Sequence, residues 1–177
     1  IKALGNLQVA KFHNPFFDVT NSITSLWFAL DFLSTSDDVI FLNGDLFLEE
    51  ELIRSIAAEK TLPVFLADSS RISEADYRFQ WQDNILKKYG KELSDEETTG
   101  EYVGIGKIDK NFVLKFVAKA NDMINSQQSG KWWEDILYSF IGTGTNVFVK
   151  DIKGIFWAEL DYIEDFQRIE AYLEDDS

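Results

Sequence analysis

Apolar residues along this chain follow two alternating patterns, short continuous runs and longer stretches with helical spacing. Short apolar runs are typical of strands, and apolar residues that recur every three to four positions are typical of helices. The runs predict strands at residues 7–12, 38–43, 62–67, 77–81, 85–89, 102–108, 147–149 and 156–160. The helical spacing predicts helices at residues 23–33, 49–58, 112–124, 132–141 and 163–173.

The order of these elements predicts the arrangement of the sheet. Strands that alternate with helices favour an α/β fold with mostly parallel strands and helices on both faces. Residues 77–81 and 85–89 are separated only by Gln82, Asp83 and Asn84, which predicts an antiparallel hairpin. We therefore expect a mixed, mostly parallel sheet. Since no repeat or linker divides the chain, residues 1–177 are expected to form one domain.

The composition is that of a globular, acidic protein. Of the 177 residues, 45% are hydrophobic and 15% aromatic, and the net charge is −14. Nucleic acid is excluded as a partner because its phosphates require lysine and arginine, whereas a metal ion and a few lysines suffice for a nucleotide. The absence of cysteine excludes disulfides and agrees with a cytoplasmic location. No apolar run approaches the ~18 residues of a membrane span.

Two aspartates follow apolar, strand-like runs that lie far apart in the sequence. Asp45 ends residues 39–45 (VIFLNGD), and Asp161 ends residues 155–161 (IFWAELD). Strand ends at one rim of an open α/β sheet bind ligands, and carboxylate oxygens suit Mg²⁺. The pattern therefore predicts a metal site formed by Asp45 and Asp161. The alternative is structural, because aspartate is a preferred N-cap and a helix is expected shortly after each residue.

The two aspartates belong to a longer series of short segments. The others are residues 21–26 (NSITSL), 100–105 (GEYVGI), 132–135 (WWED) and the pair Glu164 and Asp165. In order and spacing the series resembles the nucleotidyltransferases that activate phosphorylated small molecules, especially the phosphocholine and sugar-phosphate cytidylyltransferase branch. The resemblance implies a Rossmann-like, GT-A-type fold. It also implies Mg²⁺-dependent transfer of CMP from CTP, or another NTP, to phosphocholine or a sugar or aminoalkyl phosphate, with release of pyrophosphate.

The resemblance assigns the metal to Asp45 and Asp161 and a phosphate-neutralising role to Lys91. Lys91-Glu92-Leu93 matches a Lys-Asp/Glu-Leu step in the family. Lys87 and Lys88 lie close enough to leave that register open. A solvated lysine on a hairpin is the structural alternative.

The resemblance also implies residues that bind the nucleotide. Asn21, Ser22 and Ser25 occupy the place where the family's base-binding loop enters a helix, and Asn43 and Gly44 precede the first metal aspartate. Asparagine and serine carry both donors and acceptors, as the edge of a pyrimidine requires. A pair of N-cap residues is an equal alternative and is compatible with base contact.

Acceptor recognition is expected from a group of aromatic and acidic residues. These are Glu101, Tyr102, Gly104, Trp132, Trp133, Glu134 and Asp135. Aromatic faces beside carboxylates hold an amine through cation–π attraction and charge pairing, which favours phosphocholine, phosphoethanolamine or an aminoalkylphosphonate over a neutral sugar. The alternative is that one of the adjacent tryptophans belongs to the core.

The chain departs from the family pattern at its start. The family begins with a strand and a Gly-rich loop whose Arg and Lys grip the NTP phosphates, and nothing before Leu7 matches it. Since the sequence opens with Ile1-Lys2 instead of methionine, we expect a βα unit of roughly 30 residues to be absent. Without the loop this polypeptide is expected to be inactive. Apolar surface left by the missing strand favours a homo-oligomer.

Two other functions remain open from the sequence. A GT-A glycosyltransferase shares the sheet and the metal but is expected to carry an acidic residue at position 43, where this chain has Asn43. A non-catalytic acidic interaction domain would keep the fold without the loop. His13 has no nucleophile motif around it and is interpreted as a bystander.

Overall fold

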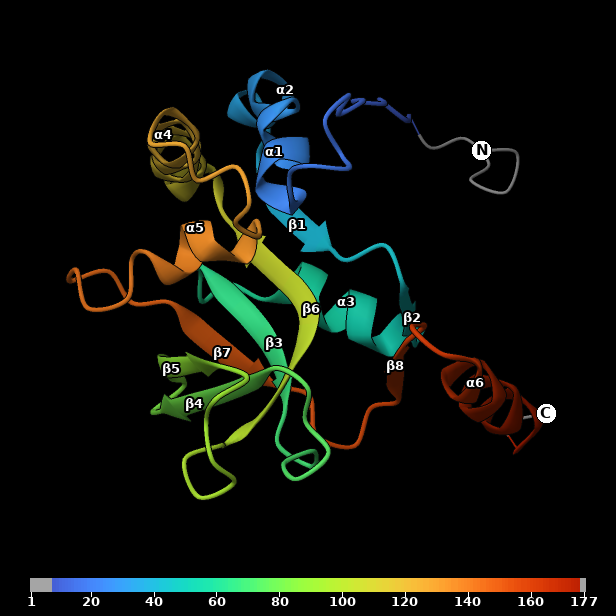
Figure 1. Cartoon of the computed structure of the whole chain (residues 1–177). Helices are drawn as coiled ribbons and strands as arrows, with labels where there is room; N and C mark the ends of the chain where they lie inside the picture. Colours follow the sequence, from blue (N-terminus) through green and yellow to red (C-terminus); the bar gives the residue numbers. More distant parts are fainter. Residues whose placement is uncertain (1–7, 176–177) are drawn as a thin grey trace.

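The structure, a computed structural model, describes residues 8–175 (Figure 1). Its strands are β1 Val39–Leu42, β2 Leu46–Leu48, β3 Val64–Asp68, β4 Arg78–Gln82, β5 Ile85–Gly90, β6 Gly100–Ile108, β7 Phe148–Asp151 and β8 Trp157–Glu159. Its helices are α1 Ser22–Trp27, α2 Leu30–Ser34, α3 Glu50–Ala58, α4 Lys110–Asn125, α5 Glu134–Tyr138 and α6 Ile163–Asp175. Six strands form a central sheet in the order β1-β6-β3-β7-β5-β4, and β2 pairs with β8 in a separate two-stranded ribbon.

Helices cover both faces of the central sheet, as Figure 1 shows. The fully buried strand β3 explains why, because successive side chains of a strand point to opposite faces. Phe65 and Ala67 pack in the core cluster shared with α1, α2, α4 and α5. Val64 and Leu66 pack on the other face, in the cluster shared with α3. The predicted mixed α/β sheet with helices on both faces is confirmed.

The expected majority of parallel neighbours is not found. Strand β6 is antiparallel to both β1 and β3, and among the described pairings β3–β7 is the parallel one. The physical reason is the route into β6. Between β3 and β6 the chain forms the hairpin of β4 and β5 and no helix, so no helical crossover is present to make these two neighbours parallel.

Local signals predicted several elements well. The hairpin of β4 and β5 turns at Asp83 and Asn84, whose φ angles of 52° and 58° lie in the left-handed region that Asn and Asp tolerate. In α4, the carboxylate of Asp109 accepts a hydrogen bond from the amide of Phe112 over 2.8 Å, which caps the helix. Both elements lie where the pattern placed them.

Other elements differ from the prediction. The helix expected at residues 23–33 is divided into α1 and α2 at Ala29, which has φ −103° and ψ 2°. Residues 8–12 of the strand expected at 7–12 have no regular structure, and Leu7 lies outside the described residues. The helix expected at 132–141 contracts to the short α5, and β2 was not predicted at all.

A buried lysine ties the sheet to α3. Lys107 in β6 is 2% exposed, and its Nζ donates to the carbonyl oxygens of Ala57 and Glu59 over 2.8 and 2.9 Å. The last carbonyls of a helix have no partner within the helix. Lys107 therefore satisfies the end of α3 while its own ammonium group is satisfied, with Asp38 3.4 Å away.

Candidate active site

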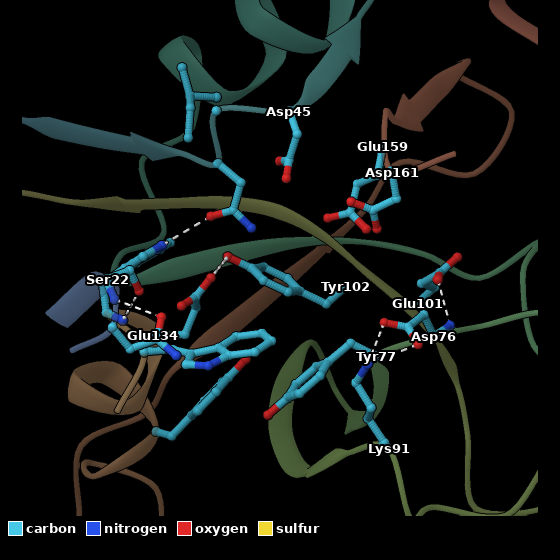
Figure 2. A pocket seen from close by; sticks show the side chains of 17 residues that line it. Ser22, Asp45, Asp76, Tyr77, Lys91, Glu101, Tyr102, Glu134, Glu159 and Asp161 are labelled. Carbon is cyan, nitrogen blue, oxygen red and sulfur yellow. Dashed lines mark hydrogen bonds and ion pairs between the residues drawn. The ribbon is translucent and has the colours of Figure 1, made fainter. Parts of the chain in front are cut away.

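A cavity of about 480 Å³ opens between β1, β6, α5 and the ribbon of β2 and β8 (Figure 2). Carboxylates face it from one side and aromatic rings from the other. The lining residues are Asn21, Ser22, Leu42, Asn43, Gly44, Asp45, Asp76, Tyr77, Lys91, Glu101, Tyr102, Trp132, Trp133, Glu134, Tyr138, Glu159 and Asp161.

Asp45 and Asp161 line the same cavity, but they do not meet at the ends of parallel strands. Asp45 precedes β2 and Asp161 follows β8, and these two strands pair antiparallel with Leu46 opposite Glu159. Beyond that pair the amide of Leu160 donates to the carbonyl oxygen of Asp45 over 2.8 Å. The ribbon, and not the rim of the central sheet, brings the two aspartates together.

The structural alternative, an N-cap role, is wrong for Asp45. The helix α3 has Glu49 as its N-cap, with β2 between Asp45 and the helix. Before α6, the amides of Asp161 and Tyr162 donate to the carboxylate of Asp165 over 3.2 and 3.0 Å. Asp165 therefore satisfies these amides, and the carboxylate of Asp161 lines the cavity.

Negative charge accumulates where these aspartates meet. Glu159 in β8 lies beside Asp161, and Figure 2 shows Asp45 across the open space from these two carboxylates. Burial, followed by the charges of Asp45 and Asp161, raises the pKa of Glu159 to about 7. Within residues 8–175 no three or more His, Cys, Asp and Glu side chains converge closely enough to hold a metal ion by themselves. A metal here would need further oxygens from a substrate.

Lys91 faces this acidic side as half of an ion pair. Its Nζ lies 2.9 and 2.7 Å from the two carboxylate oxygens of Asp76. The hydrogen bond to Asp76 raises the pKa of Lys91, and the charges of Glu159 and Asp161 add to the effect. Lys88 instead pairs with a carboxylate of the acidic loop. Lys91 is thus the lysine of that segment that reaches the cavity.

Glu101 is held more firmly than the other acidic residues. One carboxylate oxygen accepts from the amide of Asp76 over 2.7 Å, and the other lies 2.6 Å from Nε of Arg71. Burial raises the pKa of Glu101 although Arg71 opposes the shift. Its side chain is 5% exposed, so Glu101 lines the cavity as part of a fixed frame.

The opposite end of the cavity is aromatic and contains one buried carboxyl group. Tyr102 in β6 donates from its hydroxyl to Oε1 of Glu134 over 3.3 Å. Nε1 of Trp133 donates to the side-chain oxygen of Asn43 over 3.2 Å. Burial raises the pKa of Glu134 to about 7. Trp133 belongs to the hydrophobic core, where its ring stacks on Phe41 with centroids 4.7 Å apart. It also lines the cavity.

The segment before α1 caps that helix and also lines the cavity. Asn21 is the N-cap of α1, and its side-chain oxygen accepts from the amide of Ser22 over 2.7 Å. The hydroxyl of Ser22 in turn accepts from the amide of Trp133 over 2.9 Å. Because both residues also line the cavity, helix capping and ligand contact are compatible here.

Three predicted site residues lie away from the cavity. Ser25 accepts a hydrogen bond from the side chain of Asn14 over 3.1 Å, which holds the preceding loop. Asp135 accepts from the amide of Trp132 over 2.8 Å and stabilises the start of α5. Gly104 has φ +80°, and a Cβ there would approach Nδ2 of Asn43 to 3.0 Å. Asp135 and Gly104 therefore lie next to lining residues without being part of the lining, and Ser25 belongs to the preceding loop contact.

Five lining residues were not predicted, namely Leu42, Asp76, Tyr77, Tyr138 and Glu159. Two of them carried a usable signal. Glu159 stands two positions before Asp161, the spacing that places strand residues on one face. Tyr138 stands four positions after Glu134, which places both on one face of a helix. Asp76 and Tyr77 carried no such signal, because only the fold brings them to the cavity.

The fold is that of nucleotidyltransferases of known structure. An inositol-1-phosphate CTP transferase from T. maritima matches with a TM-score of 0.63 and 16% identity, over 80% of this chain and 56% of that one. A CTP:phosphocholine cytidylyltransferase from Streptococcus pneumoniae matches with a TM-score of 0.67 and 15% identity, over 90% and 67%. A putative glucose-1-phosphate thymidylyltransferase from Bacillus anthracis matches with a TM-score of 0.65 and 16% identity, over 88% of this chain and 62% of that one.

These likenesses confirm the resemblance read from the sequence at the level of the fold. The chain spans between 56% and 67% of the length of the three structures. No family model matches the chain, and no curated protein matches its sequence. None of the helices described within residues 8–175 combines the length and apolar character that a membrane crossing requires.

Proposed function

We propose that the protein containing this chain transfers a nucleotidyl group from an NTP to the phosphate of a small molecule and releases pyrophosphate. The observation that supports this most is the meeting of Asp45 and Asp161 in one cavity of a nucleotidyltransferase fold. CTP as donor and phosphocholine, a sugar phosphate or an aminoalkyl phosphate as acceptor follow from the sequence resemblance. A chain without cysteine agrees with a cytoplasmic site for this reaction.

Mg²⁺ suits the donors that this cavity offers. Mg²⁺ is usually bound through one or two carboxylates, together with waters and substrate phosphates. Asp45 and Asp161 would supply the carboxylates. The repulsion that contributes to the raised pKa of Glu159 is of the kind that a divalent cation relieves. When bound, the ion would neutralise charge between the α-phosphate of the NTP and the acceptor phosphate.

The side chains of the cavity would orient the two substrates. Lys91 attracts phosphate from the side opposite Asp45, and its own position is fixed by Asp76. Asn21 and Ser22 present a donor and acceptor edge to the base. Such positioning is the main contribution a protein makes to a reaction between two anions.

The decisive experiment measures pyrophosphate release by the full-length protein. CTP, UTP, ATP, GTP and dTTP are each combined with phosphocholine, phosphoethanolamine and glucose 1-phosphate, with and without Mg²⁺. Asp45→Asn and Asp161→Asn should each lower release by about a hundredfold or more, whereas Asp83→Asn should leave it unchanged. Asp83 is an exposed turn residue outside the cavity, and its left-handed φ of 52° suits asparagine. Absence of release with every pair would favour the non-catalytic interaction domain.

The structure offers no observation in favour of a glycosyltransferase. Position 43, where that class would carry an acidic residue, holds Asn43, and its side-chain oxygen accepts from Nε1 of Trp133. An amide is suited to this contact and provides no second carboxylate next to Asp45.

A further inference from the structure

The aromatic end of the cavity contains a carboxylate oxygen without a partner. Glu134, the first residue of α5, is 2% exposed. Its Oε1 accepts from the hydroxyl of Tyr102, but no donor among the described residues reaches its Oε2. A buried polar oxygen left in this way is unfavourable. It is expected either to carry a proton or to meet a ligand.

The groups that face Glu134 do not neutralise it. Tyr102 from β6 and Tyr138 from α5 stay uncharged, since burial raises the pKa of both hydroxyls well above the ordinary value. Tyr77, just before β4, has its pKa raised to about 12 by burial. Asp135 on α5 adds negative charge, whereas Asn43 beside β1 is neutral, although its side-chain hydrogen bond, like that of Tyr102, opposes the rise in the pKa of Glu134. Among the residues that line the cavity the cationic side chain is Lys91, which pairs with Asp76.

Aromatic faces complete the surroundings of this carboxyl group. Tyr77 is stacked with Trp132 at a centroid distance of 6.0 Å and with Tyr138 at 6.2 Å. The hydroxyl of Tyr138 is buried and interacts with the hydroxyl of Tyr77, so it is not directed at Oε2 of Glu134. The faces of these rings attract an organic cation by cation–π interaction, and the ionised carboxylate of Glu134 attracts it by its negative charge.

We infer that Glu134 determines which acceptor is used: it selects one that carries a positively charged ammonium group, and it releases its proton when that group binds. This inference rests on the proposed function. It adds the chemical class of the acceptor and a proton linked to its binding. The ammonium group lies against Glu134 and the aromatic rings, while the acceptor phosphate extends toward Asp45 and Asp161 within the same cavity.

The sign of the pH dependence follows from the protonation of Glu134. Its pKa of about 7 leaves the free carboxyl largely protonated at pH 6 and largely charged at pH 8. An ammonium ligand favours the charged form, so affinity should rise with pH through about 7 and level off above it. The gain between pH 6 and pH 8 is about tenfold for a single linked proton. An uncharged ligand should show no such gain.

The test compares phosphocholine with 3,3-dimethylbutyl phosphate, a carbon isostere that lacks the positive charge. The quaternary ammonium does not titrate. The phosphate titrates in both ligands with a different pKa, so each free ligand is titrated alone, and the affinity ratio corrected for phosphate ionisation isolates the cation site. Calorimetric titrations of the full-length protein at pH 6, 7 and 8, each in two buffers of different ionisation enthalpy, give affinity and proton release. The variants are Glu134→Gln and, as matched control, the exposed Glu51→Gln on α3.

We expect phosphocholine to bind at least tenfold more tightly than the isostere at pH 8, with proton release at pH 7 and a ratio that falls toward pH 6. Glu134→Gln should reduce the ratio to near one and abolish proton release, and Glu51→Gln should change neither. Equal affinities for the two ligands in the unmodified protein, or a ratio independent of pH, would overturn the inference without using any variant.

Failure of the inference and failure of the proposed function are distinguishable. Pyrophosphate release that proceeds equally well with both ligands would sustain nucleotidyl transfer and reject the ammonium class. Selective, proton-linked binding of phosphocholine without pyrophosphate release from any NTP would sustain the ligand class and reject the reaction.

Discussion

The amide of Leu160 donates a hydrogen bond to the carbonyl oxygen of Asp45 over 2.8 Å. This contact lies next to the β2–β8 pairing, in which Leu46 stands opposite Glu159. It places the residue before β2 beside the residues after β8. The proximity of Asp45 and Asp161 is therefore a property of the backbone and does not depend on their side chains. Substitutions of either carboxylate should leave the ribbon in place.

Asp45→Asn and Asp161→Asn should each lower the rate of pyrophosphate release by about a hundredfold or more, as loss of one preorganised electrostatic contact does. The thermal midpoint should stay the same or rise, because each change removes a charge that repels Glu159. Activity assays and thermal unfolding on the same preparations check this. A parallel loss of activity and of stability would indicate a structural role instead.

Gly106→Ala should destabilise the fold at the aromatic end of the cavity. A Cβ at this buried position would lie 2.9 Å from Cη2 of Trp133 and 3.2 Å from Cδ1 of Phe65. Overpacking of this kind costs about 1–3 kcal/mol. Urea unfolding measures the free energy, and tryptophan fluorescence reports displacement of Trp133. Gly130→Ala is the control, since a Cβ there meets nothing within 4 Å. Equal stabilities of the two variants would contradict the packing argument.

Lys107→Met should lower the free energy of unfolding by about 1–3 kcal/mol, the cost of leaving buried polar groups unsatisfied. Methionine keeps the length of the side chain but removes the donor to the carbonyl oxygens of Ala57 and Glu59. Chemical denaturation checks the size of the effect. The same change at the exposed Lys115 on α4 should be nearly neutral. If both variants unfold alike, Lys107 does not support the end of α3.

Glu59 should make the stability of the protein depend on pH in the acid range. The amide of Thr61 and then the ammonium group of Lys150 lower the pKa of Glu59 from 4.5 to about 2. Above pH 4.5 its contribution is complete, and it is lost as the pH falls from 4.5 toward 2, because the unfolded state binds the proton first. The lowered pKa corresponds to about 3 kcal/mol at full strength, and partial solvent screening of a side chain that is 18% exposed reduces this to about 2 kcal/mol.

Comparison of the unmodified protein with Glu59→Gln isolates this contribution. Denaturant unfolding at intervals between pH 6 and pH 2.5 should show a stability difference that shrinks as the pH falls. The other carboxylates titrate in both proteins and cancel. A difference that stays constant over the whole range would show that Glu59 is not responsible.

The parts of the fold that were predicted correctly depend on neighbours in sequence. Asp83 and Asn84 specify a tight turn by their own backbone preferences, and Asp109 caps α4 through its own side chain. The pairing of β2 with β8 depends on residues far apart in the sequence, and no local signal marked the division of the first helix at Ala29. No pattern of apolar residues within a three-residue strand such as Leu46–Leu48 identifies its partner.

The same contrast between local sequence signals and contacts between distant residues applies to the cavity. Asp45, Asp161 and Glu134 were identified because each stands in a short motif whose residue types suit the proposed chemistry. Tyr77 has no such motif and reaches the cavity only through the sheet, with its ring stacked on Trp132. Ser25, by contrast, stands in a motif but contacts Asn14, because on α1 its side chain faces away from the cavity.

The charge balance of the cavity has a consequence for the order in which reactants enter. Carboxyl groups such as Asp45, Glu101 and Glu159 line it, whereas Lys91 is already engaged by Asp76. Under the proposed reaction, a bare triphosphate would be repelled at the entrance. The nucleotide should therefore arrive as its magnesium complex, and metal-free NTP in excess should act as a poor competitor instead of a strong one.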